Sequence, residues 1–342
     1  MIVAAFLLVS PPARAAQTGG LGDATPISAT LAQAVETDKI QGMSVNEVMS
    51  TAKKWELAIY GGAAVLVFAF LLAAGLIRPG GFAKAGLRDV KGLPWTIWLF
   101  AAIVVLLAQQ AAPELLDHMG WWKENTLSED QQLVVRLLAG AVLGGLTGIG
   151  MLYVMHKSSP ESGLRLSPLD APVGLGCFAL AFPIIMLGSI AGVALHTQLA
   201  GEPPPEIAHA TLQNIVDWWQ RSPGDPWLWG MLLAVVVGAP LVEELIFRVF
   251  VQAAMIKLLK SPWVGIMVTA LGFALIHRLH GPGAAPVPWH ALVPIFVLGV
   301  ANGVGYERTK RVGVPITMHI CFNAFNIIVA LVSHPAAAQP AV

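Results

Sequence analysis

Long apolar stretches alternate with short polar ones along most of the chain. Eight apolar segments follow residue 56, and each is close to the ~20 residues that a helix needs to cross a bilayer. The fifth is too long for a simple crossing, so we expect it to project beyond the lipid. The pattern predicts an all-α, polytopic membrane bundle of about eight transmembrane helices. The segments lie near residues 57–77, 95–112, 132–155, 172–195, 227–256, 262–279, 288–306 and 313–333.

The composition supports this interpretation. Of the 342 residues, 56% are hydrophobic and 12% are charged, whereas a soluble domain averages about 25% charged residues. The net charge is zero, so composition gives no case for nucleic-acid binding. Cys177 and Cys321 lie inside apolar segments, where we expect small core residues rather than a disulfide or a metal pair. Tryptophans mark segment starts, as interfacial side chains do: Trp95, Trp98, Trp227, Trp229, Trp263 and Trp289.

Polar segments occupy both ends and one internal stretch. Residues 1–16 resemble a signal peptide, with a short apolar run and then a small-residue Ala-Arg-Ala-Ala site. Residues 17–56 are polar and rich in small residues, so we expect little order there. Residues 196–226 carry Leu212, Ile215, Val216 and Trp219 at helical spacing. This spacing fits a helix on the membrane surface or a helix packed on the bundle. The remaining predicted divisions are four helices at 57–195, a second four-helix region at 227–333 and a tail at 334–342.

Basic residues are unevenly distributed between alternate loops. The poorer side has six, three of them in the N-terminal tail. By the positive-inside rule the richer side faces the cytoplasm, so we predict a multi-pass protein of a bacterial inner or plasma membrane with both termini outside. The richer side has eleven basic residues: Arg78, Lys84, Arg88, Lys91, Lys157, Arg165, Lys257, Lys260, Arg308, Lys310 and Arg311.

The fifth apolar segment contains two adjacent carboxylates and an arginine. Charge in hydrocarbon is costly, so such residues normally face a protein interior and mark function. Glu244 and Arg248 stand four residues apart on one helical face, with the acid first. Glu243 points about 100° away around the axis. Pro240 cannot donate a backbone hydrogen bond, which we expect to free the carbonyl of Val236 and to kink the helix.

Two further polar pairs lie on later apolar segments, and each pair shares one helix face because its members are four residues apart. The fifth and sixth segments form a predicted helical hairpin that turns near Lys260. Glu243 lies 17 residues before Lys260 and His277 lies 17 residues after it, so a rise of about 1.5 Å per residue puts them at the same height. The pairs are Phe273 with His277, and His319 with Asn323. His196, His209 and His290 lie in loops or at segment edges, where we expect solvated side chains.

Together these residues supply the groups needed to hydrolyse an amide bond. Glu243, poised against His277, would act as general base on a water molecule. His319 and Asn323 would donate hydrogen bonds to a developing oxyanion. Alternatively, Glu243, His277 and His319 would hold a catalytic zinc ion with one open position. Taken singly, each motif also fits a structural role, as an intrahelical ion pair, an interfacial histidine or a hydrogen bond between helices.

In this order, Glu-Glu-x-x-x-Arg, Phe-x-x-x-His and His-x-x-x-Asn resemble the CPBP family, the CAAX-protease and bacteriocin-processing family of intramembrane proteases, also called Abi. The resemblance covers about residues 225–330. It implies endoproteolysis of a membrane-associated or lipidated, CAAX-like protein, by either a zinc-dependent or a metal-free glutamate mechanism. It maps the water-activating glutamate onto Glu243, supporting residues onto Glu244 and Arg248, the water-orienting histidine onto His277, and the oxyanion-stabilising pair onto His319 and Asn323.

Two other classes of protein fit parts of the pattern. A proton-coupled transporter would use buried Glu and His side chains as proton relays and Pro240 as a helix break, but no repeat relates the two halves of the chain. A non-catalytic scaffold or a bacteriocin-immunity protein would use the same polar residues as packing contacts. The protease hypothesis predicts a membrane protein or lipidated peptide as substrate, the bilayer as surroundings, and no nucleic-acid partner.

Overall fold

The computed structural model describes residues 45–78, 80–82, 92–121, 127–155, 166–205, 207, 209–278 and 287–335. The predicted signal peptide and most of the polar segment after it lie outside these residues. The chain forms two compact units, Met1–Gly62 and Ala63–Val342. Helix α3 (Val45–Ala73) crosses the boundary and is the only described element of the first unit. All candidate site residues belong to the second unit.

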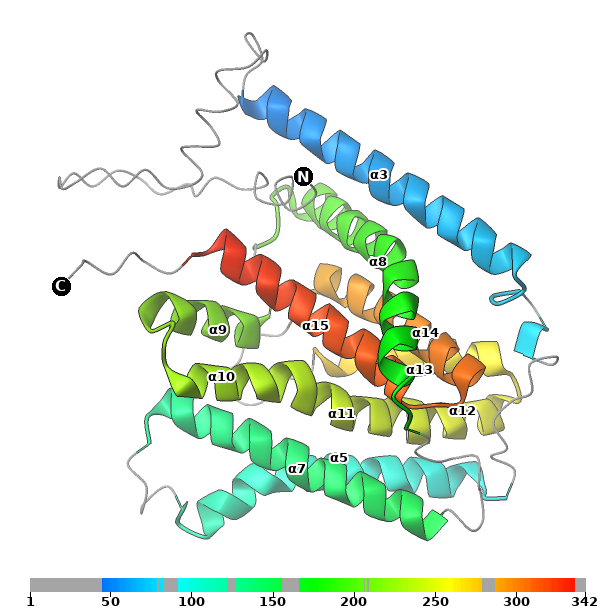
Figure 1. The fold of residues 1–342 in the computed structure, drawn as a ribbon, viewed down its shortest axis with the longest axis vertical. Coiled ribbons are helices and arrows are strands. Elements are labelled where there is room, and N and C mark those ends of the chain that lie inside the picture. Colours follow the sequence, from blue (N-terminus) through cyan, green and yellow to red (C-terminus); the bar gives the residue numbers. More distant parts are fainter. Residues whose placement is uncertain are drawn as a thin grey trace. The chain divides into compact units, whose positions relative to one another are not determined.

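The regular elements described in the second unit are all helical (Figure 1). Seven helices of the described residues, α3 included, are long and apolar enough to cross a membrane, and the shorter apolar helix α13 makes an eighth. The prediction of an all-α polytopic bundle is thus confirmed, although α13 is shorter than its predicted segment. The elements are α5 (Trp95–His118), α7 (Glu129–Met155), α8 (Asp170–Ala200), α9 (Ala210–Arg221), α10 (Pro226–Leu233), η1 (Ala234–Gly238), α11 (Ala239–Glu244), η2 (Leu245–Val251), α12 (Gln252–Leu259), α13 (Pro262–Ile276), α14 (Trp289–Thr309) and α15 (Gly313–Ser333).

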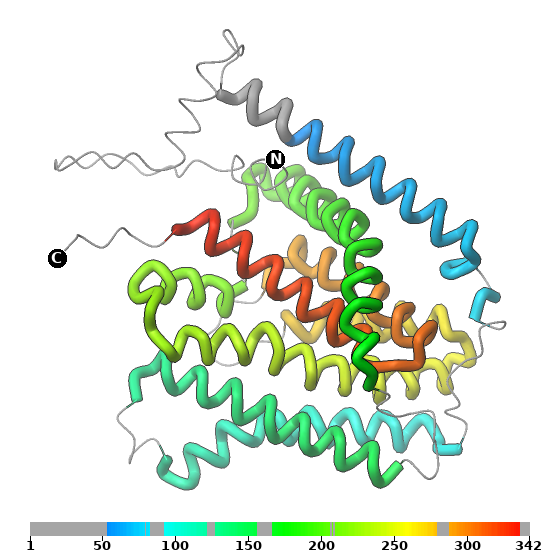
Figure 2. The backbone as a smooth tube through the Cα atoms, viewed as in Figure 1, coloured from blue at the N-terminus to red at the C-terminus, as the bar shows by residue number. Residues whose placement is uncertain are grey.

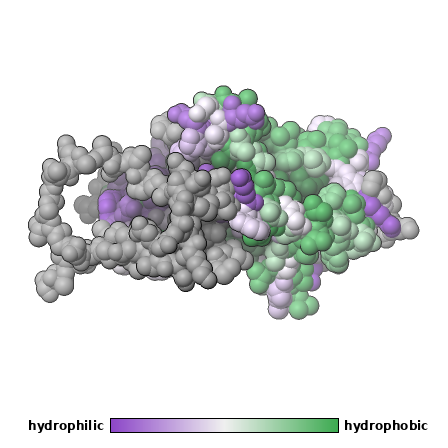
Figure 3. All heavy atoms as spheres, turned by 90° about the horizontal axis from the view of Figure 1, so that it is seen from above, coloured by the Kyte–Doolittle hydropathy of each residue, from purple (hydrophilic) through white to green (hydrophobic). Residues whose placement is uncertain are grey.

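Apolar side chains cover the outer faces of these helices. Apolar residues dominate the coloured surface visible in Figure 3, and hydrophilic residues gather towards its margins. Large exposed examples include Phe100, Leu107, Val142 and Leu146. Monomeric soluble proteins rarely expose such extended apolar area, whereas lipid tails solvate it. The protein is therefore an integral, multi-pass membrane protein.

The continuous helical run from Pro226 to Leu259, 34 residues long, organises the bundle. Its successive parts are α10, η1, α11, η2 and α12, which follow one another along one line in Figures 1 and 2. Helices α5 and α7 contact it on one side in this view, and α13, α14 and α15 contact it on the other. Helix α8 packs against α14 and α15. The run that carries the two glutamates is thus packed against other helices on both sides.

A stripe of glycines on α7 lets the glutamate-bearing helix come close. Gly140, Gly144 and Gly148 are buried at four-residue spacing. A Cβ atom at Gly144 would lie 3.0 Å from Val242, and one at Gly148 would lie 3.1 Å from Leu245. Small residues at this spacing allow close backbone approach of helices in membranes. The stripe therefore fixes α11 and the start of η2 against α7.

Helix α9 packs on the bundle, as one of the two interpretations of this stretch expects. Ile215 and Trp218 are 0% and 4% exposed. They join a hydrophobic cluster with side chains of α7, α10 and α15. The Trp218 indole N–H also donates to Asp225 at 3.1 Å. The apolar face of α9 is thus occupied by other helices rather than by lipid.

The prediction that His290 is solvated was wrong. Its side chain is buried, with 5% exposure, and its ring lies edge to face with that of His196, 4.7 Å between centroids. The reason lies in the partner helix: a Cβ at Gly192 of α8 would lie 2.6 Å from the carbonyl oxygen of His290. Glycine at this crossing brings α8 onto the start of α14 and covers the imidazole.

Candidate active site

Two π-helical stretches, η1 and η2, flank the two glutamates. The backbone N–H that follows η1 bonds to the carbonyl five residues earlier. In this register the next carbonyl, that of Val235, would pair with the nitrogen of Pro240, which carries no hydrogen. Asn323 supplies the missing donor, with its Nδ2 2.9 Å from the Val235 oxygen. π-Helical turns inside α-helices are frequent at functional sites.

This register corrects the prediction made for Pro240. The carbonyl left for an outside donor is that of Val235 rather than Val236, because hydrogen bonds here reach five residues back instead of four. The helical elements on either side of Pro240 follow one another without a gap. The amide of Asn323 therefore ties α15 to η1, just before the glutamates.

Glu244 is fully buried and receives three hydrogen bonds. Its Oε2 accepts from Arg248 Nε at 2.8 Å, and both side chains are 0% exposed. Its Oε1 accepts from Asn302 Nδ2 at 3.0 Å and from His319 Nδ1 at 2.9 Å. A buried carboxylate is tolerated when it is paired and hydrogen-bonded in this way. The ion pair between Glu244 and Arg248 is thus present, and two further helices donate to the same carboxylate.

Glu243 has a different environment. Its side chain is 24% exposed, and its Oε2 is buried without a hydrogen-bond partner among the described residues. His319 Nε2 lies 3.8 Å from this oxygen. That separation is too long for a direct hydrogen bond but fits a bridging water. His319 therefore faces both glutamates, Glu244 through Nδ1 and Glu243 through Nε2.

Phe273 packs between the two histidines. Its ring centroid is 4.9 Å from that of His277 and 5.5 Å from that of His319, edge to face in both cases. The guanidinium of Arg248 lies 5.1 Å from the same ring, a cation–π contact. The Phe273 ring thus connects its own Phe-x-x-x-His motif to Arg248 of the Glu-Glu-x-x-x-Arg motif and to His319 of the His-x-x-x-Asn motif.

His277 directly follows α13, and its Nδ1 lies 2.7 Å from the carbonyl oxygen of Phe273. Because a carbonyl only accepts, Nδ1 carries the hydrogen and Nε2 is left for another partner. Within the described part of the chain, His277 makes neither a hydrogen bond nor an ion pair with Glu243. A functional link between them would therefore run through a water molecule or the substrate.

The hairpin between α12 and α13 brings Phe273 beside Arg248 and His319, with His277 next to it. Lys260 adopts a left-handed conformation, with φ 53°, after the end of α12. Ser261 then caps α13 by accepting from Val264 N, and Pro262 takes the first helical position, which suits its missing N–H. A Cβ at Gly265 would lie 2.6 Å from Ile256, so the two helices pack closely near the turn.

The three predicted zinc ligands do not form a ligand set. In the described ranges, no three His, Cys, Asp or Glu side chains are grouped so that they could hold one ion. Near Glu243, the Nδ1 of His319 and the carboxylate of Glu244 already bond to each other.

Asn302 on α14 is the site residue that the three motifs do not reveal. It is wholly buried and donates to Glu244 as described above. Its signal in the sequence is a polar residue within an apolar span, between Gly299 and Gly303. Five residues after it, Glu307 is also buried and accepts from Gln252 Nε2 at 2.9 Å. Helix α14 thus contacts the glutamate-bearing run through two buried polar side chains.

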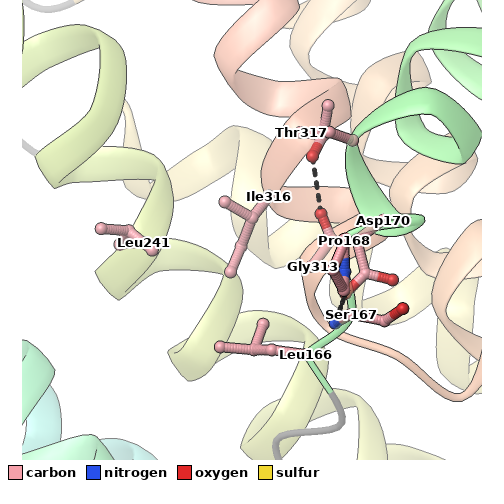
Figure 4. A pocket seen from close by; sticks show the side chains of 9 residues that line it. Leu166, Ser167, Pro168, Asp170, Leu241, Gly313, Ile316 and Thr317 are labelled. Atoms are coloured by element: carbon pink, nitrogen blue, oxygen red, sulfur yellow. Dashed lines mark hydrogen bonds between the residues drawn. The ribbon is translucent and has the colours of Figure 1, made fainter.

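An open pocket of about 410 Å³ lies on another face of α11 (Figure 4). Leu241 lines it from α11, and Ile316 and Thr317 line it from α15. Leu241 precedes Glu243 by two residues, so the two side chains point about 200° apart around the helix. None of the six candidate residues of the motifs is among the residues that line it. The candidate site is the polar cluster around the glutamates, not this pocket.

Comparison with known families identifies the segment that holds this cluster. Residues 225–325 match the model of the Rce1-like type II CAAX prenyl endopeptidases. Neither the curated proteins nor the solved structures gave a match. The matched segment runs from the start of α10 into α15 and contains all six candidate residues of the motifs. Residues 225–325 thus match a domain of the CPBP family of intramembrane endopeptidases.

Proposed function

We propose that the protein hydrolyses a peptide bond of a membrane-associated or lipidated protein, with water activated by Glu243. One observation carries the proposal. The Oε2 atom of Glu243 is buried and unpartnered, and it lies 3.8 Å from the Nε2 atom of His319. A desolvated carboxylate oxygen with a spare lone pair, opposite an imidazole nitrogen, is the arrangement that general-base catalysis on water needs.

The chemical step follows from these groups. A water molecule donates one hydrogen to Glu243 Oε2, and its oxygen attacks the carbonyl carbon of the substrate. The proton passes to Glu243 as the new C–O bond forms and the carbonyl becomes an oxyanion. When the tetrahedral intermediate collapses, the C–N bond breaks, and Glu243 returns the proton to the leaving amine. Glu243 thus acts first as base and then as acid, and it ends in its starting form.

His319 supports the oxyanion in this proposal. Glu244 accepts the Nδ1–H of His319 at 2.9 Å and so holds Nε2 toward the reacting centre. When Nε2 also carries a hydrogen it is a donor to the oxyanion, a role worth roughly 10²–10³ in kcat. Arg248 holds the other oxygen of Glu244 through its 2.8 Å bond. The paired carboxylate thus fixes the ring that faces the negative charge developing on the substrate.

His277 and Asn323 have the remaining roles. His277 presents Nε2, because Nδ1 bonds to the Phe273 carbonyl, and we assign it to orienting the water. Asn323 uses one amide hydrogen on Val235. Its second hydrogen remains for the oxyanion, as the family resemblance implies. Asn323 would therefore serve the helix and the reaction together.

The substrate class follows from the membrane setting and the family. The glutamates lie in the longest membrane-spanning run of the described chain, so the scissile bond must reach them at or within the bilayer. A protein whose C terminus is held at the membrane by a lipid group or by an apolar segment meets this requirement. Rce1-like endopeptidases are described by their action on prenylated CAAX proteins, and we extend this substrate class to the present chain.

The test is cleavage of C-terminal peptides, with and without a prenyl group, by purified protein in detergent. Wild type should cleave at least one peptide. Glu243→Gln should lower kcat by about 10²–10⁴, the usual contribution of a general base, and His277→Ala should also lower it. Glu114→Gln, at an exposed carboxylate on α5, is the matched control and should keep full activity. A zinc chelator should leave the wild-type rate unchanged.

Two results would overturn the proposal. Cleavage that survives Glu243→Gln would remove this residue from the chemistry. Cleavage of none of the peptides by folded wild-type protein would favour the scaffold, in which the same polar residues serve as packing contacts. Loss of cleavage on chelation, restored by added zinc, would replace the metal-free mechanism but not the assignment as a protease.

A further inference from the structure

Among the described residues, the Asn302 side chain makes one hydrogen bond, and that bond goes to Glu244. Its Nδ2 lies 3.0 Å from Glu244 Oε1, the oxygen that also accepts from His319 Nδ1. Its Oδ1 is buried and has no partner among the described residues. The orientation of the amide follows from chemistry, because reversal would set Oδ1 against a carboxylate oxygen and oppose two acceptors. The side chain thus serves one carboxylate.

Close helix packing holds the amide in this position. Gly299 and Gly303 flank Asn302 at the four-residue spacing that allows helices to approach in membranes. A Cβ at Gly299 would lie 3.1 Å from Ala270 Cβ, and one at Gly303 would lie 2.8 Å from Gln252 Oε1. Gln252 Nε2 also donates to the carbonyl of Gly303 at 3.2 Å. These contacts fix the height of α14 beside the glutamate-bearing run, and with it the reach of Asn302.

We propose that Asn302 is a positioning residue of the active site. It fixes the Glu244 carboxylate so that Oε1 holds the Nδ1–H of His319 and leaves Nε2 directed toward Glu243. The role rests on the function proposed above. Asn302 touches none of the groups assigned to the chemical step directly; it acts through Glu244 and then His319. The charged or titratable groups of this arrangement are Glu243, Glu244, Arg248 and His319.

The unpaired amide oxygen supports a role in geometry rather than in stability. A buried carbonyl without a partner destabilises the folded state. A leucine at this position would have a similar shape and would leave no such oxygen. The Asn302 side chain therefore lowers the stability of the folded state through its unpaired oxygen, although it also makes a hydrogen bond. Such a cost in stability is common where a residue is retained for activity.

The first experiment compares Asn302→Leu with Thr269→Val. Thr269 is also buried, at 1% exposure, and its hydroxyl also lacks a partner within the described structure, so it is a matched loss of a buried polar atom. We expect Asn302→Leu to lower kcat roughly 10- to 100-fold, with KM unchanged and Tm within a few degrees of wild type. Thr269→Val should change none of these. A fall in Tm that accounts for the lost activity would mean a merely structural role and would overturn the proposal.

The second variant, Asn302→Asp, tests the need for a donor. An ionised aspartate would face Glu244 as a like charge, so the loss of kcat at neutral pH should exceed that of Asn302→Leu. At lower pH the protonated acid regains an O–H donor. Activity relative to wild type should therefore rise as the pH falls for Asn302→Asp, but not for Asn302→Leu. A pH profile parallel to that of Asn302→Leu would contradict the donor role.

A third measurement does not depend on cleavage. The Nδ1–H proton of His319, bonded to a carboxylate, should give a far-downfield proton NMR signal that is missing from His319→Gln. Asn302→Leu should shift or remove it, and Thr269→Val should not. An unchanged signal in Asn302→Leu would overturn the proposal even in an active enzyme. If wild type cleaves no peptide but the signal shifts in Asn302→Leu, the proposed function is wrong, whereas the positioning of Glu244 and His319 by Asn302 is supported.

Discussion

The surroundings of Glu243 and Glu244 differ in how completely their polar atoms are paired. Glu244 is 0% exposed and takes donors from three side chains. Glu243 is 24% exposed, and one of its oxygens has no partner in the described chain. The two are neighbours in sequence and point about 100° apart around the helix. A carboxylate saturated with donors is held in place, whereas one with a spare oxygen can accept a proton.

His319 connects the two environments. Its Nδ1 donates to Glu244, whose two oxygens are both hydrogen-bonded, and its Nε2 faces Glu243. Glu244 therefore orients the imidazole ring that also faces Glu243, the residue proposed to activate water. Predictions that disturb one side at a time test this separation.

Among changes around Glu244, Arg248→Met should have the largest effect on stability. It leaves Glu244 as a buried charge with its strongest partner removed, and such a loss typically destabilises by 3–5 kcal/mol, roughly. The free energy of unfolding in detergent should fall by about this amount. Asp130→Asn is the control, because its pair with Arg221 is largely exposed, and exposed pairs contribute about 0–1 kcal/mol. Equal losses in the free energy of unfolding for both variants would contradict a buried Glu244 that depends on its ion pair with Arg248.

His319→Gln should disturb both sides. It removes the donor to Glu244 Oε1 and the ring that faces Glu243, so we expect kcat to fall by about 10²–10³. Some stability should be lost as well, because one buried hydrogen bond to a charged group disappears, a loss of about 1.5–3 kcal/mol. Single-turnover cleavage and thermal unfolding of the same preparation would measure both. A variant with full activity would remove His319 from the site.

Asn323→Leu should have the smallest effect of the three on stability and should separate two roles. It leaves the Val235 carbonyl without the donor that Pro240 cannot supply, which destabilises by about 1–3 kcal/mol. If Asn323 also donates to the oxyanion, kcat should fall further than in Asn323→Ser, which keeps a hydroxyl donor. Equal kcat values for the two variants would assign Asn323 to the helix contact alone.

Much of the fold could be predicted because the apolar segments, the hairpin and the Glu244–Arg248 pair depend on local spacing. Lys260 and Pro262 mark the turn by their own backbone preferences, so its place follows from the sequence. The ion pair needs only a helix, since its members are four residues apart. These features involve contacts within one element or between neighbouring elements.

The missed features depend on packing between distant elements. Asn302 lies 58 residues from Glu244, and their contact depends on how close Gly299 and Gly303 allow α14 to come. The π register near Pro240 depends on Asn323 arriving from α15 with a donor. His290 is covered because Gly192 brings α8 close. Spacing along the chain carries no information on such distances.

The central claim is that Glu243 performs the chemistry and Glu244 organises the site. The most direct test measures kcat and Tm of Glu243→Gln and Glu244→Gln side by side. Glu243→Gln should lower kcat by about 10²–10⁴ while Tm stays near that of wild type, because its Oε2 has no partner to lose in the described part of the chain. Glu244→Gln should lower Tm by several degrees, because it leaves Arg248 buried without its charge partner. The reverse pattern, with cleavage retained by Glu243→Gln, would contradict the account.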